Sequence, residues 1–306
     1  MHVIESVRQM QQWADGQRAA ARRIGFVPTM GYLHRGHLSL IELARSRTDC
    51  VVVSIFVNPL QFGANEDFDR YPRDLDGDRR KLESAGVDVL FLPRTEELYP
   101  PGFQTAVEVE RVTRGLCGAS RPTHFRGVTT VVAKLFLAVK PHVAVFGAKD
   151  FQQLVTVRQM VRDLNFDIEI LSGPIVREAD GLAMSSRNAY LSPAERVAAR
   201  AIFQALSEAR AAFASGERNA DRLRELVVSR LSSVPLARID YVELVDAETL
   251  EPVRRIARPG VLAVAAFLGS TRLIDNCLLD PAEETGSATE GVADEDSQQL
   301  PTEGSV

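Results

Sequence analysis

A short stretch near the N-terminus decides the fold: residues 24–37 read IGFVPTMGYLHRGH. Its first four positions are apolar or small, as in a β-strand that is buried on both faces. A glycine-containing turn follows, and then Leu38, Ile41 and Ala44 recur at the spacing of one helix face. We therefore predict a strand at residues 24–27 that leads through the turn into a helix, which is a unit of a parallel α/β sheet.

The same alternation of apolar strands and periodic helices continues downstream. Residues 50–57 (CVVVSIFV) form an almost continuous apolar run, typical of a strand covered on both faces. Further strands are predicted at residues 87–92, 143–146 and 167–171, and helices at residues 74–85, 128–139 and 152–164. This order predicts the fold class as α/β, with a doubly wound parallel sheet.

The pattern changes near Gly173 and Pro174, where helices come first and strands follow. Helices are predicted at residues 193–216 and 220–234, and strands at residues 239–245, 261–268 and 272–279. We expect an N-terminal domain at residues 1–175 and a smaller α+β domain at residues 176–280. Residues 281–306 contain seven acidic residues and neither Lys nor Arg, so we expect an acidic, disordered tail.

Composition excludes several classes of function. The chain of 306 residues has a net charge of −5, and without the tail the remainder carries −5 + 7 = +2. A nearly neutral body argues against nucleic acid as a partner. No run approaches 18 apolar residues, so no membrane span is expected, and the N-terminus lacks a signal-peptide pattern. The spacing of Cys50, Cys117 and Cys277 indicates neither disulfides nor a zinc site, and a reducing cytoplasm is the simplest location.

The turn before the first predicted helix has the features of a phosphate site. Gly31 and Gly36 allow the backbone to approach a ligand closely, and the free N–H groups of a helix start attract anions. His34 and His37 are three residues apart, so both imidazoles can point into one space and stabilise developing charge. The alternative is a plain strand–turn–helix corner with two partly exposed histidines. The position of HxGH at the first βα junction favours nucleotide binding.

Three further segments complete a candidate site. In FGAKDFQQ (residues 146–153), Lys149 can pair with phosphates, Asp150 fits a helix N-cap and Gln153 offers an amide; a capped helix with a surface lysine is the alternative. In MSSRN (residues 184–188), small hydroxyls and an arginine suit a mobile phosphate clamp. In FVNPLQFG (residues 56–63), Gln61 follows a buried strand, where ligands of parallel sheets bind.

Taken together, these segments resemble the pantothenate synthetase family, within the HxGH superfamily of nucleotidyltransferases. The resemblance covers residues 22–279 and rests on VPTMGYLHRGH, SIFVNPLQFGANEDFDRYPR, RPTHFRGV, FGAKDFQQL, VREADGLAMSSRN and DYVELVD. It implies a Rossmann-like domain with a C-terminal lid, usually a homodimer, and a reaction that uses ATP and Mg²⁺. In that reaction pantoate attacks the α-phosphorus to give pantoyl adenylate and pyrophosphate, and the amine of β-alanine then displaces AMP.

The resemblance also assigns roles to individual residues. ATP would be bound by Met30, Gly31, Tyr32, Leu33, His34, Arg35, Gly36, His37, Gly147, Ala148, Lys149, Asp150, Val176, Met184, Ser185, Ser186 and Arg187. Among them His37 takes the position of a proton donor, and His34, Lys149, Ser185, Ser186 and Arg187 complete the catalytic set. Gln61 would contact pantoate and β-alanine, Gln153 would contact pantoate, and Arg121 would help to close the site. A dedicated base for the attacking amine is not evident: a histidine or bulk solvent would both serve.

One position departs from the family pattern. The family usually has a pair of acids after RYPR, near the magnesium, and the pair here is Gly77 and Asp78. Asp78 is therefore the candidate metal ligand, with Asp76 as a possible substitute. On a helix Asp76 and Asp78 lie about 200° apart and should not face the same ion.

Two other functions are compatible with part of this pattern. A different adenylyl or cytidylyl transferase would share HxGH but would not need the GAKDFQQ and NPLQFG segments. A nucleotide sensor without activity would bind ATP and release no product, whereas the intact set of polar residues favours turnover. Formation of AMP only when ATP, pantoate and β-alanine are all present would separate the three.

Overall fold

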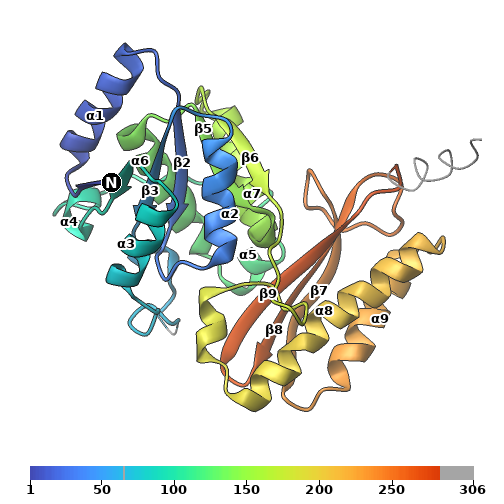
Figure 1. Ribbon diagram of the computed structural model, residues 1–306. Coiled ribbons are helices and arrows are strands. Elements are labelled where there is room, and N and C mark those ends of the chain that lie inside the picture. Colours follow the sequence, from blue (N-terminus) through green and yellow to red (C-terminus); the bar gives the residue numbers. More distant parts are fainter. Residues whose placement is uncertain (65, 283–306) are drawn as a thin grey trace, which may run out of the picture.

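The computed structural model describes residues 1–64 and 66–282. Within them, six parallel strands form one sheet in the order β1-β4-β3-β2-β5-β6 (Figure 1). Their bounds are His2–Ile4 for β1, Ile24–Thr29 for β2, Cys50–Ile55 for β3, Val89–Phe91 for β4, Val143–Gly147 for β5 and Glu169–Gly173 for β6. The chain leaves β2 toward β3 on one side, while β5 pairs on the other side of β2. Ligands of such sheets bind beyond the carboxyl ends of the strands at this reversal.

Successive residues of the strands point to opposite faces, and helices cover both. The even-numbered side chains of β2 and β3, such as Phe26 and Val52, pack against α1 (Val7–Ala19), α6 (His124–Val139) and α7 (Phe151–Asp163). The odd-numbered ones, such as Val27 and Val53, pack against α2 (Arg35–Arg45) and α3 (Leu75–Ser84). Burial on both faces explains the apolar runs that predicted this architecture, and the α/β prediction is confirmed.

The smaller part of the chain has an antiparallel sheet, β7-β8-β9, in the same described residues. Its elements are α8 (Pro193–Ala214), α9 (Ala220–Ser232), β7 (Ala237–Asp246), β8 (Gly260–Leu268) and β9 (Thr271–Leu279). Alternate residues of β8 divide between two cores. Leu262 and Val264 pack with α8 and α9, whereas Val261 and Ala263 join a cluster with Val112 and Val155 of the N-terminal part. The sheet thus has one face under its own helices and one against the larger domain (Figure 1).

The main differences from the predicted elements lie at short or polar segments. Strand β1, helix α1 and the short helices α4 (Thr95–Leu98) and α5 (Cys117–Ser120) were not predicted. Helix α6 begins four residues before the predicted start at 128, and β6 lies two residues beyond the predicted 167–171. Because β6 ends at Gly173, a boundary at residue 175 is compatible with the fold but stays a prediction.

The predicted tail from 281 to 306 falls almost entirely outside the described residues, and its disorder stays a prediction. Among the residues that are described, no helix combines the length and the apolar character needed to cross a membrane.

Candidate active site

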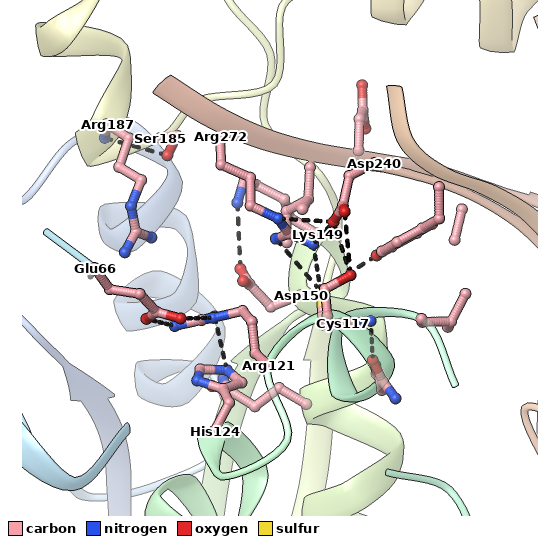
Figure 2. Close-up of a pocket in the computed structure, with 18 of the residues that line it drawn as sticks. Glu66, Cys117, Arg121, His124, Lys149, Asp150, Ser185, Arg187, Asp240 and Arg272 are labelled. Atoms are coloured by element: carbon pink, nitrogen blue, oxygen red, sulfur yellow. Dashed lines mark hydrogen bonds and ion pairs between the residues drawn. The ribbon is translucent and has the colours of Figure 1, made fainter. Parts of the chain in front are cut away.

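The predicted site residues gather beyond the carboxyl ends of β2 and β5, where the described residues enclose two adjoining cavities. The cavity of about 210 Å³ that contains His34 and His37 is called the HxGH cavity. The cavity of about 580 Å³ that reaches Asp240 and Arg272 of the C-terminal sheet is called the interdomain cavity (Figure 2). Side chains of both linings form a shared wall: Met30, Gln61, Lys149, Asp150, Gln153, Ser185 and Arg187.

The two histidines of the HxGH motif cap their own helix. His34 is the N-cap of α2, and its Nδ1 accepts a hydrogen bond from the backbone N–H of Gly36 at 3.2 Å. The Nδ1 of His37 accepts from the backbone N–H of His34 at 3.2 Å, and the ring centroids are 4.1 Å apart. Because a backbone N–H only donates, each Nδ1 carries no proton, and the proton of each neutral imidazole is on Nε2.

Both imidazoles are neutral at pH 7. Burial, reinforced by the charge of Lys149, lowers the pKa of His34 to about 4. Burial together with the neighbouring His34 lowers the pKa of His37 to about 3. Each residue therefore lines the HxGH cavity with an Nε2–H that can donate to an anionic oxygen.

The glycines of this turn are required by close packing. A Cβ at Gly36 would lie 2.9 Å from Cε1 of His34, so a larger residue would displace the capping imidazole. Gly31 has a φ of +85°, in the left-handed region that favours glycine, and a Cβ there would be 3.0 Å from Ile55. The loop can therefore hold the two histidines above the strand end only with glycine at these positions.

Asp78 supports this loop from below, and its role as a metal ligand stays a prediction. It is 1% exposed, and its two oxygens accept the backbone N–H groups of Tyr32 and Leu33, both at 2.7 Å. Lys81 reinforces the arrangement by donating to the carbonyl of Leu33 at 2.8 Å. Asp76, which was the possible substitute, is exposed on the other side of α3. Asp78 is a ligand of backbone amides, and the part of the chain that is described contains no cluster of three potential metal-ligating side chains.

The departure at Gly77 also has a local explanation. The carboxylate of Asp74 caps α3 by accepting from the backbone N–H of Gly77 at 2.9 Å. A Cβ at Gly77 would be 1.9 Å from an oxygen of Asp74 and would push the cap aside. Glycine at this position therefore preserves the start of the helix that carries Asp78.

The second segment predicted to bind nucleotide lies at the end of β5, in the short 3-10 helix η2 (Ala148–Asp150). Lys149 Nζ is 3.4 Å from a carboxylate oxygen of Asp150, and both residues line both cavities. Burial opposes ionisation of Asp150, but the charge and hydrogen bond of Lys149, together with the charge of Arg187, outweigh burial and lower the pKa of the carboxyl. From β9, Asn276 donates to the carbonyls of Ala148 at 3.0 Å and Lys149 at 2.9 Å. The smaller domain thus holds the segment that presents Lys149.

Two details of this segment differ from expectation. Asp150 occupies the N-cap of α7 as predicted, but its side chain makes no capping hydrogen bond within the described residues. The adjacent glutamines have separate roles. Gln152 is buried and holds the preceding loop through the backbone of Val112, Gly115 and Cys117, whereas Gln153 lines both cavities.

The serine–arginine segment closes the site from the C-terminal side. Arg187 forms a bidentate pair with Asp67, with both N···O distances at 2.8 Å. Ser186 donates to the carbonyl of Tyr32 at 3.2 Å, and Ser185 accepts from the backbone N–H of Arg187 at 3.3 Å. These contacts tie 3-10 helix η3 (Ser186–Tyr190) to the HxGH loop and to the loop after β3.

Gln61 stands between the two cavities on 3-10 helix η1 (Pro59–Gln61). Its Oε1 accepts from Nδ2 of Asn58 at 3.1 Å, and its Nε2 donates to the thioether of Met30 at 3.0 Å. Arg121 is close by but is bound to Glu66 and His124 (Figure 2). Since sulfur is a weak acceptor, the Nε2–H groups of Gln61 are the part of this cluster that is ready for a substrate oxygen.

The structure separates the predicted ATP residues into two kinds. Met30, His34, Gly36, His37, Gly147, Lys149, Asp150, Val176, Met184, Ser185, Ser186 and Arg187 line the HxGH cavity. Gly31, Tyr32, Leu33, Arg35 and Ala148 lie off both cavity walls in the described structure, with Leu33 in the core and Arg35 exposed. Gly31, Tyr32, Leu33 and Ala148 shape the loops through their backbone.

Several wall or support residues were not singled out from the sequence. Glu66 and Asp67 lie within the quoted segment that begins at Ser54, His124 lies within RPTHFRGV, and Asp240 lies within DYVELVD. The motifs therefore marked these regions without indicating what each residue does. Nothing in the sequence marked Arg272 or Asn276. Both come from β9 and meet the N-terminal domain only through the tertiary fold.

Comparison with known proteins gives one consistent result. A family model described as pantoate-beta-alanine ligase matches residues 2–278. A pantothenate synthetase of Thermotoga neapolitana is 56% identical over 279 residues, which is 91% of this chain and 100% of the relative. A solved pantothenate synthetase from Thermus thermophilus has a TM-score of 0.86 at 48% identity, covering 92% of this chain and 100% of that one. A pantoate-beta-alanine ligase from Francisella tularensis, solved in complex with beta-gamma ATP and beta-alanine, has a TM-score of 0.75 at 34% identity, covering 91% and 97%.

Proposed function

This chain belongs to the pantoate–β-alanine ligase family, and on that premise we propose how its own residues join pantoate to β-alanine with ATP. The observation that carries the proposal is that two neutral, Nε2-protonated histidines and Lys149 line the HxGH cavity, and that Lys149 also lines the interdomain cavity. ATP occupies the HxGH cavity with its phosphates toward these groups, and the two acids meet at the shared wall.

In the first half-reaction a carboxylate oxygen of pantoate attacks the α-phosphorus of ATP. A P–O bond forms to pantoate, the bond to the β-phosphate breaks, and pyrophosphate leaves with the electron pair. Negative charge concentrates on the phosphates, where His34 and His37 donate Nε2–H and Lys149 and Arg187 supply positive charge. His37, which takes the proton-donor position by resemblance, acts through this hydrogen bond, because its low pKa leaves no imidazolium at pH 7 in the free protein.

In the second half-reaction the amine of β-alanine attacks the carbonyl carbon of pantoyl adenylate. A C–N bond forms, the C–O bond to the phosphate breaks, AMP leaves and the nitrogen loses a proton. Gln61 and Gln153 line both cavities, so their amides are placed to bind pantoate while the amine approaches through the interdomain cavity. The apolar contacts between the two domains protect the adenylate from water.

Mg²⁺ enters this proposal with ATP rather than with the protein. In this proposal Asp78 supports the HxGH loop, because its two buried oxygens each accept a backbone N–H group. Mg²⁺ commonly binds substrate phosphates and keeps several of its waters.

The family resemblance further supports a homodimer and a cytoplasmic location, and light scattering of the purified chain measures its oligomeric state.

The test separates the half-reactions. With ATP and pantoate alone, we expect release of pyrophosphate close to one equivalent per site, and steady formation of AMP only after β-alanine is added. A nucleotidyl transferase of another kind would ignore pantoate, and a nucleotide sensor would bind ATP without turnover. Full-rate release of AMP without β-alanine, or no pyrophosphate without it, would contradict the sequential mechanism.

A further inference from the structure

The RPTHFRGV segment, residues 121–128, contributes a residue to the wall of the interdomain cavity at His124, yet the proposed chemistry gives it no task. Arg121, His124 and Gly127 are spaced by three residues, and all three contact the short segment that ends at Gln61. Figure 2 shows Glu66, Arg121 and His124 as one connected group beside the cavity. The segment therefore acts on η1 as a unit.

The backbone carbonyl of Gln61 is held from two sides. It accepts from Nδ1 of His124 at 2.9 Å and from Nη2 of Arg121 at 3.2 Å. Nη1 of Arg121 lies 3.2 Å from Nε2 of His124, and since a guanidinium only donates, this Nε2 is the acceptor. The proton of the neutral ring is therefore on Nδ1, where it donates to Gln61. Burial and the charge of Arg121 lower the pKa of His124 to about 4, so the neutral form persists at pH 7.

Arg121 is fixed by an acid before it reaches Gln61. Its Nε donates to Oε1 of Glu66 at 2.6 Å, and Nη2 pairs with the second oxygen. A guanidinium engaged by Glu66, His124 and the carbonyl of Gln61 is oriented inside the protein. Its position on the cavity wall thus reflects support of Gln61 more than a contact with substrate.

The third contact depends on the absence of a side chain. A Cβ at Gly127 would lie 2.2 Å from the carbonyl oxygen of Leu60 and 2.6 Å from the nitrogen of Gln61. Nδ2 of Asn58 bridges the carbonyl of Gly127 and Oε1 of Gln61, at 3.1 Å each. Helix α6 therefore packs directly on the backbone of η1, and both ends of Gln61 are fixed while Nε2 faces Met30.

We propose that His124 is a positioning residue for the acid substrate: the Nδ1–H bond to the Gln61 carbonyl, in a ring oriented by Arg121 and Glu66, sets where the Gln61 amide meets pantoate. The inference rests on the proposed function for the identity of that acid. His124 acts through Gln61 and leaves ATP binding unaffected. Small displacements of a group that orients a reactant lower the rate strongly, so the loss of this bond affects the use of pantoate.

A matched pair of variants tests the proposal. An asparagine side chain places its N–H₂ near the position of Nδ1, whereas glutamine reaches the position of Nε2 and offers no donor at Nδ1. We expect His124→Gln to lower kcat/KM for pantoate by about 10-fold to 100-fold with the KM for ATP unchanged. His124→Asn should stay within about threefold of the wild type, because the donor to Gln61 is kept. His142→Gln, at a histidine that holds the start of β2 away from both cavities, is the control and should leave both constants unchanged.

Coupling to Gln61 distinguishes positioning from a loss of folding. In a Gln61→Ala background, His124→Gln should cause no further loss of kcat/KM for pantoate, whereas general destabilisation would add to it. An equal effect in both backgrounds, a matching change in the KM for ATP, or wild-type kinetics of His124→Gln would overturn the proposal. If no variant of His124 folds, ¹⁵N NMR of the ligand-free wild type decides: a proton on Nε2 of His124 and none on Nδ1 refutes it. A wild-type protein that never forms AMP would reject the proposed function instead, while the NMR result still stands.

Discussion

The two helix starts that face the HxGH cavity are built in opposite ways. Helix α2 follows β2 and is closed by its own side chains, because His34 and His37 accept its first N–H groups. Helix α7 follows the neighbouring strand β5, and its N-cap residue makes no capping bond within the described residues. Instead the carbonyls of Ala148 and Lys149 are held by Asn276 from the other domain. The first start is assembled within its domain, and the second depends on docking of the smaller domain.

This difference indicates how the site divides its tasks. The imidazoles are neutral, oriented donors whose geometry is fixed by α2 before any ligand binds. Lys149 is the charged partner, and the backbone of its segment is held by Asn276 of β9. The position of the smaller domain therefore influences where the charge of Lys149 lies.

The largest expected effect comes from truncating one side chain at each of the two helix starts. His37→Ala and Lys149→Ala should each lower kcat for pyrophosphate release by about 10²–10³, because each removes a contact to developing charge. Only His37→Ala should also destabilise the fold, by about 1 kcal/mol, since His34 then loses the acceptor of its N–H. Single-turnover assays and urea unfolding measure the two effects. Equal losses of stability in the two variants would show that the starts of α2 and α7 are not built differently. A near wild-type rate in either variant would show that the truncated residue does not act in the site.

A smaller effect is expected from the support beneath the α2 start. Asp78→Ala leaves the N–H groups of Tyr32 and Leu33 without their acceptor, so we expect a loss of about 2–4 kcal/mol in the free energy of unfolding. Asp76→Ala, on the exposed side of the same helix, is the matched control and should change little. Urea unfolding and Mg²⁺ titration at fixed ATP are the measurements. A raised Mg²⁺ requirement at unchanged stability would restore Asp78 as a metal ligand.

The α7 start is tested through its interdomain contact. Asn276→Asp keeps the size of the side chain but replaces the N–H₂ that donates to two carbonyls. We expect kcat for adenylate formation to fall by about 30-fold, in line with the loss of two hydrogen bonds worth about 1 kcal/mol each. The combination with Lys149→Ala should add nothing if Asn276 acts through Lys149. Full additivity of the two losses would show that Asn276 acts elsewhere.

A pH-dependent effect also separates the two helix starts. The pKa of His34 is about 4 in the folded protein and about 6.5 when unfolded, so the unfolded state binds more protons between these values. Stability therefore falls as the pH is lowered from about 6.5 to 4, by at most about 1.4 kcal/mol per pH unit for this group. His34→Asn keeps a capping oxygen and should reduce that slope.

At the α7 start, stability changes over a different pH range. Lys149 lowers the pKa of Asp150 from its usual value near 3.8, so the stabilisation from this carboxyl is present above that value and is lost below it. Asp150→Asn should leave the slope between pH 6.5 and 4 unchanged. Urea unfolding across this range measures both variants, and equal slopes for wild type and His34→Asn would show that His34 is not held neutral.

Much of the fold could be predicted because burial on both faces leaves a clear pattern. The strand of residues 50–55 is apolar at every position except Ser54, and it was recognised from that alone. Strand β1 has three residues, and α1 (VRQMQQWADGQRA) buries fully only Met10 and Ala14. Neither element therefore has an apolar pattern long enough to be recognised in the sequence. The start of α6 was missed because His124 to Gly127 pack on η1, and this contact is visible only in three dimensions.

The sequence predicted which segments meet at the site, but it did not predict the role of each side chain. HxGH and GAKDFQQ indicated the two helix starts, yet the sequence did not show that the histidines face their own backbone through Nδ1. The sequence also did not show that the amide of Gln152 forms hydrogen bonds with backbone groups, whereas Gln153 lines both cavities. Asn276 follows Lys149 by more than a hundred residues, and a contact over that separation has no local signal.

The shared wall between the two cavities has a consequence for inhibitors. Lys149, Gln153 and Ser185 each face both the HxGH cavity and the interdomain cavity. A compound that contacts these three side chains competes at both compartments at once. A substitution that weakens such a compound also alters a wall that the two cavities share.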